Sequence, residues 1–302
     1  MFDREARQDN AMDTSEAVVR LAGGQRAVVE LDPDHPGFRD EQYRARRNAI
    51  AQIAVDYRPG DPIPDTAYSA QEQQVWSTVR QALAPVHARH ACSEYLASLE
   101  RLDLPGDRIP QLREVSHRIE PLSKFRLEPV AGLVTPRVFL SVLAHDTFLA
   151  TQYIRHHSAP LYTPEPDVVH ELMGHAVMLA SPLFAGINRL VGTAVRRTRT
   201  EAGIDFLSKV FWYTVEFGAL VEDGEVRAYG AGLLSSAGEL AAMHQAELRP
   251  IDFAEMGRRD YDVTRFQPVL YVADSLSDLL RRLGQFLEQW DERAPPRPAA
   301  GH

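Results

Sequence analysis

Apolar residues recur at steps of three and four along most of this chain, and that period restricts it to a largely helical fold. In the segment 275–290 they form one helical face, which consists of Leu276, Leu279, Leu280, Leu283, Phe286, Leu287 and Trp290. Residues 70–86 follow Ser69, a residue type that caps helices, and predict a second helix. We also expect helices over 166–179, with a proline near the start, and over 205–220, where apolar residues on nearly all sides predict burial.

Strand patterns are few and short by comparison. We expect strands over 225–229, next to Asp223 and Gly224, and over 269–272. The fold class that follows is mainly α with a small amount of β.

The domain organisation is simple, because no linker or internal repeat interrupts residues 29–290. We predict that these residues form one domain, which carries the chemistry. Residues 1–28 are polar and spotted with glycine, and predict a flexible N-terminal arm. Residues 291–302 are rich in proline and predict a disordered tail.

Charge and cysteine content exclude several classes of function. The chain has 33 basic and 42 acidic residues, a formal net charge of -9, so we expect no nucleic-acid partner and no polybasic membrane surface. No apolar run approaches the roughly 18 residues of a membrane span, and the N-terminus lacks a secretion signal, so we expect a cytoplasmic protein. Cys92 is the only cysteine, which excludes an internal disulfide, an iron–sulfur cluster and a cysteine-rich zinc site.

Two histidines, His170 and His175, stand five residues apart in a segment that is apolar on one side. Imidazole nitrogen is a preferred ligand of Zn, Fe, Cu and Ni. Zinc proteases place their histidines four apart on one helical face, so a zinc-protease motif is not present. Residues five apart lie about 140° apart around an ideal helix. Both can reach one metal if the helix is distorted or ends between them, and Gly174 makes that easy.

Glu216 is a candidate third ligand, because it is an acid inside an apolar helical segment and a buried carboxylate needs a cation. Two histidines and one carboxylate form the ligand set of non-haem iron(II) oxygenases. On these residues alone, a structural histidine pair and a Glu–Arg ion pair remain alternatives. The other histidines, including His156 and His157, show no acid at useful spacing, and we interpret them as surface residues or as neighbours of the site.

Eight blocks in order over residues 40–290 carry a family resemblance. They are RRNAI (46–50), IPQL (109–112), PVAGL (129–133), TQYIRH (151–156), YTPEPDVVHELMGH (162–175), YTVEFG (213–218), AYGAGLLSS (228–236) and FQP (266–268). In these blocks the chain resembles the catalytic domain of the pterin-dependent aromatic amino acid hydroxylases, which act on phenylalanine, tyrosine and tryptophan. The resemblance implies that family's catalytic-domain fold.

The resemblance also implies a metal site and a cofactor site. His170, His175 and Glu216 would hold Fe(II), and Glu171 would be an acid close to the iron and the pterin. The pterin would stack on a phenylalanine ring and contact a short stretch of backbone, which are supplied by Phe139 and by Gly132, Leu133 and Val134. On its own, Phe139 would be interpreted as a core aromatic residue.

The substrate site that the resemblance implies contains one arginine. Arg155 would hold the substrate carboxylate through its planar fork. The other residues would place the amino acid backbone or form the walls of the ring pocket, and they are Thr163, Pro166, Phe184, Trp212 and Ser235. Without the resemblance, Arg155 would be interpreted as a surface ion pair and Ser235 as a helix cap.

The implied activity is that of a monooxygenase. A tetrahydropterin would supply two electrons and O2 the oxygen atom for the ring of a free aromatic L-amino acid, with L-phenylalanine to L-tyrosine as the expectation. Several residues near the pocket depart from the family pattern, namely Leu149, Ala176, Val177, Phe211 and Ala237. They keep meta-hydroxylation of phenylalanine and hydroxylation of tryptophan open.

Two other classes compete with this reading. A metal-dependent hydrolase is disfavoured by the five-residue histidine spacing, and an inactive binding module by the intact ligand set together with Arg155. Eukaryotic members carry regulatory and tetramerisation segments for which the sequence outside the matched blocks leaves little room. We therefore expect a monomer.

Overall fold

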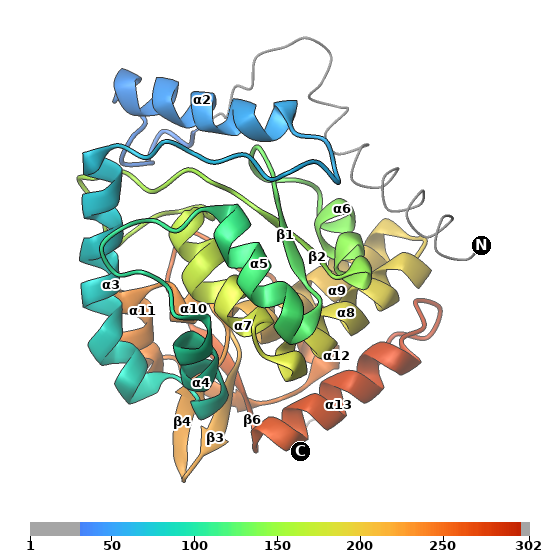
Figure 1. The fold of residues 1–302 in the computed structure, drawn as a ribbon. Coiled ribbons are helices and arrows are strands. Elements are labelled where there is room, and N and C mark those ends of the chain that lie inside the picture. The colour runs from blue at the N-terminus through green and yellow to red at the C-terminus, as the bar shows by residue number, and fades with distance from the viewer. Residues whose placement is uncertain (1–30, 297–302) are drawn as a thin grey trace.

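Helices make up most of the structure, a computed structural model that describes residues 31–296 (Figure 1). The α-helices are α2 (Glu41–Asp56), α3 (Ala70–His90), α4 (Ser93–Leu102), α5 (Leu112–Ser123), α6 (Pro136–Ser141), α7 (Val177–Leu179), α8 (Pro182–Arg197), α9 (Glu201–Phe211), α10 (Ala231–Leu234), α11 (Ala237–Ala242), α12 (Phe253–Met256) and α13 (Leu276–Gln289). Two 3₁₀ turns, η1 (Val142–His145) and η4 (Met243–Gln245), and two π-helical segments, η2 (His170–Ala176) and η3 (Trp212–Glu216), complete the helical structure. This confirms the mainly α fold class.

Within residues 31–296, six short strands form two small sheets. Strands β1 (Arg126–Pro129) and β2 (Thr147–Ala150) pair in parallel. The second sheet has the order β4-β3-β6-β5 and contains β3 (Ala219–Glu222), β4 (Glu225–Ala228), β5 (Glu247–Pro250) and β6 (Val269–Ala273). Strands β3 and β4 form a hairpin whose two turn residues, Asp223 and Gly224, both have positive φ, which suits the right-handed twist of the strands. The expected strands at 225–229 and 269–272 are confirmed as β4 and β6.

One hydrophobic core extends from α3 to the end of α13, and this confirms a single domain. Helix α2 lies outside that core and crosses the top of the helical body in Figure 1. Its buried apolar side chains are few: Ile50 is buried, and Ala51 and Ala54 meet Ala131 in a small cluster. Polar contacts, described below, therefore carry much of the attachment of α2.

The two helices with the clearest sequence pattern form as expected. The Ser69 side chain accepts a hydrogen bond from the Glu72 N–H and Glu72 returns one to the Ser69 backbone, so a capping box starts α3. Helix α3 continues to His90, four residues beyond the expected end. The Ser275 side chain caps α13 in the same way by accepting from the Asp278 N–H.

The other two expected helices differ from the pattern at their ends. The helix expected over 166–179 begins only after Asp167 and changes at once to the π form, so Pro166 lies outside it. The helix expected over 205–220 begins earlier, at Glu201, and ends at Glu216. It stops there because the chain leaves the helical region and Ala219 already pairs with β4.

The predicted flexible arm, residues 1–28, lies outside the described residues, as do residues 297–302 of the predicted tail. The first residues of that tail are described. The Glu292 carboxylate accepts hydrogen bonds from the backbone N–H groups of Arg199 and Thr200 at 3.0 and 2.9 Å.

No single helix within residues 31–296 is long and apolar enough to cross a membrane. The pair His170–Leu179 and Pro182–Arg197 passes that test only when taken together, and it is bent by 101° at the break. Most residues of this pair are buried in the core described above, as expected for core helices.

Two glycines of α8 test how closely this helix packs. A Cβ on Gly192 would overlap the backbone of Ala144 in η1, whereas a Cβ on Gly186 would meet nothing within 4 Å. We expect Gly192→Ala to lower the free energy of unfolding by more than about 2 kcal/mol, because packed backbone must move. We expect Gly186→Ala to raise it by about 0.5–1 kcal/mol through helix propensity. Urea unfolding of both variants measures the contrast, and equal effects would contradict this packing.

Candidate metal centre

His170 and His175 face the same point because η2 is a π-helix. In this form the backbone bonds run from i to i+5, so residues five apart come to lie above one another. The Nε2 atoms of the two rings are 3.0 Å apart. The helical distortion that the spacing required is therefore present, as a π segment rather than a break. Gly174 is needed for a further reason, since a Cβ there would lie 2.7 Å from the Ala231 carbonyl oxygen of α10.

Glu216 reaches the same point from η3, the other π segment. Its Oε1 is 3.0 Å from His175 Nε2 and its Oε2 is 3.6 Å from His170 Nε2. The ligand atoms of these three residues all lie within 4.8 Å of one another. Two imidazoles and one carboxylate, largely shielded from solvent, thus form one cluster with the donor set predicted from the sequence.

The charge state of this cluster suits a divalent cation. Burial lowers the pKa of His170 to about 4 despite the opposing charge of Glu216, so this imidazole is neutral at neutral pH. Burial acts to raise the pKa of Glu216, but the charge and hydrogen bond of His175 outweigh it and hold that pKa below its usual value. Burial acts to lower the pKa of His175, and Glu216 reverses this and raises it. A cation that binds here would displace the proton shared by His175 and Glu216.

Ser235 fixes the orientation of the His170 ring. The Ser235 hydroxyl donates to the Gly232 carbonyl at 3.2 Å, and its oxygen lies 2.9 Å from His170 Nδ1. Nδ1–H therefore donates to Ser235, and the free lone pair of Nε2 points to the centre of the cluster. The donors present, their tautomer and their burial fit Fe(II).

Two cavities open onto this cluster. The first, of about 210 Å³, includes Phe139, Leu149, Glu171 and Phe211 in its lining, and the second, of about 370 Å³, includes Arg155, Thr163 and Ser235. Both share a set of walls at the cluster, namely Leu133, Pro166, His170, Trp212, Glu216 and Tyr261. The two cavities thus adjoin one another at the cluster.

Asp167 connects the second cavity to the metal cluster. Its carboxylate accepts from Arg155 Nε at 2.9 Å, from Arg155 Nη2 at 2.8 Å and from the Arg155 backbone N–H at 2.8 Å. It also accepts from the His170 backbone N–H at 3.1 Å, and so caps the helix that carries the histidines. Arg155 and Asp167 are 4 % and 1 % exposed, so this is a buried ion pair rather than a surface one.

The comparison with known proteins agrees with this geometry. The family model described as biopterin-dependent aromatic amino acid hydroxylase matches residues 12–294. The chain belongs to this family.

Individual members resemble the chain to similar degrees. It is 44% identical over 264 residues to phenylalanine-4-hydroxylase of Rattus norvegicus, an alignment that covers 85% of this chain and 58% of that one. It is 41% identical over 258 residues to phenylalanine 3-hydroxylase of Streptomyces coeruleorubidus, with 85% and 92% covered. The chain therefore spans less than two thirds of the rat relative.

A solved structure of the family has the same fold. Phenylalanine hydroxylase of Chromobacterium violaceum, with bound iron(III) and oxidised cofactor 7,8-dihydrobiopterin, matches with a TM-score of 0.71 at 27% identity, and the match covers 82% of this chain and 93% of that one.

Most residues predicted for the cofactor and the substrate are brought together. The four residues predicted for the pterin line the first cavity, with Glu171 beside them, and they are Gly132, Leu133, Val134 and Phe139. Five of the six predicted for the substrate line the second cavity, and they are Arg155, Thr163, Pro166, Trp212 and Ser235.

Phe184 is the exception and corrects the expectation from the sequence. It is 2 % exposed, its ring stacks on Tyr229 at 5.8 Å, and it lines neither cavity. It lies in the first turn of α8, which begins at the capping residue Ser181 and packs this side chain into the core.

Three residues at the site, Glu239, Gln267 and Tyr261, were not predicted from the sequence. Glu239, 9 % exposed, accepts a hydrogen bond from the Gln267 backbone N–H at 2.7 Å, and Gln267 Oε1 accepts from Trp212 Nε1 at 3.0 Å. The Trp212 ring stacks on Tyr261 at 4.0 Å. Gln267 lies in a matched block, which was a usable signal, whereas nothing near Glu239 in the sequence indicated its partner.

The buried carboxyl group of Glu239 predicts that the stability of the fold depends on pH. Burial raises the pKa of Glu239 from 4.5 to about 7. Between these values the folded protein keeps a proton that the unfolded chain has released, so this group makes the free energy of unfolding fall as the pH rises. We expect Glu239→Gln to remove that fall. Its free energy of unfolding, compared with that of wild type, should therefore rise by up to about 3 kcal/mol from pH 5 to pH 8.

Urea unfolding at both pH values measures the difference. Glu288→Gln, at an exposed glutamate of α13, is the matched control and should follow wild type at both. A difference between Glu239→Gln and wild type that does not change with pH would contradict the role of this carboxyl.

Proposed function

We propose that the chain is a non-haem iron(II), tetrahydropterin- and O2-dependent monooxygenase that hydroxylates the ring of a free aromatic L-amino acid, with L-phenylalanine as the first candidate. The observation that carries this proposal is the buried cluster of two histidines and one carboxylate, open to two separate cavities. Family membership supports it. The chemistry needs a metal, a reductant and a substrate side by side, and the two cavities offer that arrangement.

In this proposal His170, His175 and Glu216 hold the iron. Three protein ligands on one side leave further coordination positions open. The bound metal and the tetrahydropterin together supply the activation of O2. The protein positions the partners and keeps the centre shielded from bulk water.

The first cavity suits a flat heterocycle. Phe139 offers a ring held edge-to-face by Phe148 and Phe211, with centroids 5.3 and 6.0 Å away. Glu171 lies on the same cavity and is oriented by Thr151, whose N–H and hydroxyl both donate to its Oε1, at 3.1 and 3.0 Å. Its carboxyl group is an acceptor for an N–H of the pterin. Leu149 adds an apolar wall where a polar contact was expected.

The second cavity suits an α-amino acid. Arg155 lines it while Asp167 holds Nε and Nη2, so the guanidinium is fixed in orientation before a substrate carboxylate arrives. The Thr163 and Ser235 hydroxyls offer hydrogen-bonding partners for the amino acid backbone. Trp212, held by Gln267 and Tyr261, provides a flat apolar wall for the ring. A rigid arrangement of this kind determines which ring carbon faces the metal.

A second candidate activity is meta-hydroxylation of phenylalanine. It is supported by the match to phenylalanine 3-hydroxylase of Streptomyces coeruleorubidus, at nearly the identity found for the 4-hydroxylase of Rattus norvegicus. The experiment is an anaerobic iron load followed by separate reactions of L-phenylalanine and of L-tryptophan with tetrahydropterin and O2, and chromatography that separates the two tyrosine isomers. 4-Hydroxyphenylalanine supports the first candidate, the 3-isomer the second, and product from tryptophan alone contradicts both.

The metal ligands make a direct prediction. We expect His170→Ala, His175→Ala and Glu216→Ala each to lose bound iron and turnover while the fold persists, because the ligands serve a dissociable metal. Metal analysis, a coupled pterin-oxidation assay and circular dichroism measure these three properties. His117→Ala, at an exposed histidine of α5, should behave as wild type. Turnover at the wild-type rate in any ligand variant would contradict the assignment.

Arg155→Lys tests the substrate site. Losing a charge-assisted bidentate contact costs about 1.5–3 kcal/mol, so we expect the KM for phenylalanine to rise at least roughly tenfold. A compact ammonium group cannot reproduce the fork, so control of the ring should loosen and pterin should be oxidised without matching product.

Steady-state kinetics with product and consumed pterin both quantified measure this effect. Arg108→Lys, which changes an exposed arginine paired with Glu114 at 2.8 Å, is the control. If Arg155→Lys keeps the KM, the coupling and the product ratio of wild type, Arg155 serves the ion pair with Asp167 alone.

A further inference from the structure

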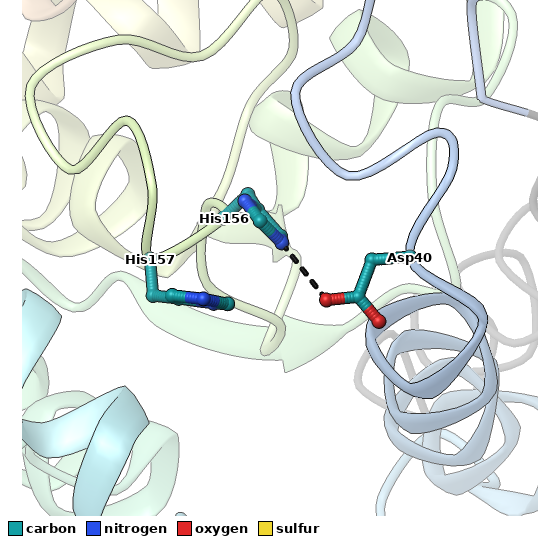
Figure 2. Close-up of side chains that lie close together, drawn as sticks. All are labelled: Asp40, His156 and His157. Atoms are coloured by element: carbon teal, nitrogen blue, oxygen red, sulfur yellow. Dashed lines mark hydrogen bonds and ion pairs between the residues drawn. The ribbon is translucent and has the colours of Figure 1, made fainter.

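A second group of metal-type ligands lies outside the catalytic cluster. Asp40, immediately before α2, meets His156 and His157 from the loop after β2, and their ligand atoms lie within 4.8 Å of one another. Figure 2 shows the His156 ring pointing at the Asp40 carboxylate from across the gap between loop and helix. None of the three lines either cavity described above. The acid that the two histidines lacked in the sequence is supplied from 116 residues away.

The spacing of the donor atoms suits a metal ion. His156 Nε2 is 3.1 Å from Asp40 Oδ2. Two ligands bonded at about 2.0–2.1 Å lie about 2.9 Å apart in octahedral and about 3.4 Å apart in tetrahedral geometry. The observed separation falls between these values, so a cation can bind between the two atoms with little movement. His157 is exposed, and its ring centroid is 4.2 Å from that of His156, so a side-chain rotation brings it into range.

The two inner ligands are held by their other polar atoms. His156 Nδ1 lies 2.7 Å from Ser158 Oγ, and Asp40 Oδ1 accepts from the Tyr43 N–H at 3.0 Å. Outer hydrogen bonds of this kind fix ligand orientation in metal sites. The Tyr43 N–H bond and then the His156 bond lower the pKa of Asp40. The side chain of His156 is 7% exposed and that of Asp40 is 34% exposed, so a cation can enter from solvent without disturbing the core.

We propose that Asp40, His156 and His157 form a second site for a divalent cation of the zinc type, separate from the catalytic centre. Two imidazoles and one carboxylate, with water at the open position, are ligands that Zn(II) accepts. On binding, the neutral His156 ring carries its proton on Nδ1, where Ser158 Oγ can accept it, so that the Nε2 lone pair joins the metal, while Asp40 exchanges a hydrogen bond for a metal bond. This site goes beyond the proposed function and does not depend on it.

The role of such a site follows from its place in the fold. Helix α2 buries few apolar side chains: Ile50 is buried, and Ala51 and Ala54 form a small cluster with Ala131. Its polar ties go to α3 through Arg46, which pairs with Glu72 at 2.9 Å, and also to the segment that carries Arg155 and to the loop that follows it. The Tyr43 hydroxyl donates to the Ile154 carbonyl at 3.0 Å, and buried Arg47 pairs with Glu165 at 2.8 Å. A cation at Asp40 would join α2 to this segment one residue beyond Arg155, and we expect it to stabilise the fold.

The experiment counts metal ions on the full chain after equilibrium dialysis against Zn(II). We expect two ions per wild-type chain, one in His157→Ala, one in Asp40→Asn and one in His170→Ala. Asparagine still caps α2, so Asp40→Asn removes the anionic ligand without removing the helix cap. The control His117→Ala should keep two.

A thermal shift separates the two sites. In the His175→Ala background, Zn(II) should raise the Tm by several degrees, and the added change His157→Ala should abolish that shift.

Each outcome has a distinct meaning. A single ion that is lost in His170→Ala but kept in His157→Ala overturns the second site and leaves the proposed function intact. A second ion that persists in both His157→Ala and Asp40→Asn overturns this ligand assignment. A single ion that is lost in His157→Ala but kept in His170→Ala supports the second site and removes the metal basis of the proposed function.

Discussion

The structure depends on one buried carboxylate, Glu216, held between two imidazoles. A carboxylate without a partner inside a protein is costly, and here His175 lies 3.0 Å away and His170 3.6 Å away. Ordinary α-helical geometry would turn the two histidines to different sides. Both helices that supply the ligands instead adopt the π form at these residues, a form found mostly as short segments at functional sites.

The cavities are organised around this cluster by a few buried polar contacts. Asp167 caps the π segment and at the same time fixes Arg155, so the orientation of Arg155 is coupled to the orientation of the helix that carries His170 and His175. On the opposite wall, Glu239 and Gln267 hold Trp212. In each case a residue that is not a metal ligand orients a side chain that lines a cavity. The specificity of the site is therefore distributed over residues far apart along the chain.

The two metal-type clusters use the same donor set, each with two histidines from one short segment and an acid from a distant one, and they differ in burial. The catalytic cluster takes its two histidines from one short segment and is shielded from solvent. The cluster at Asp40 takes its acid from the start of α2 and is open to solvent. The buried one can exclude water and house chemistry, whereas the open one can join two segments. In the two proposals, burial rather than ligand type separates catalysis from stabilisation.

The sequence by itself determined what depends on local patterns. The helical periods, the cap at Ser69, and the set His170, His175 and Glu216 were all readable, because residue type and short spacing specify them. Matched blocks likewise indicated most of the residues that line the two cavities.

Only the tertiary structure decided the rest. It selected the π form at His170, because packing against α10 and the need to share one ligand point outweigh the ordinary helical bond. It placed Phe184 in the core instead of the substrate cavity, and paired Glu239 with Gln267 and Asp40 with His156. These pairings join residues 28 and 116 positions apart. No local pattern encodes them, since they exist only once the helices have packed.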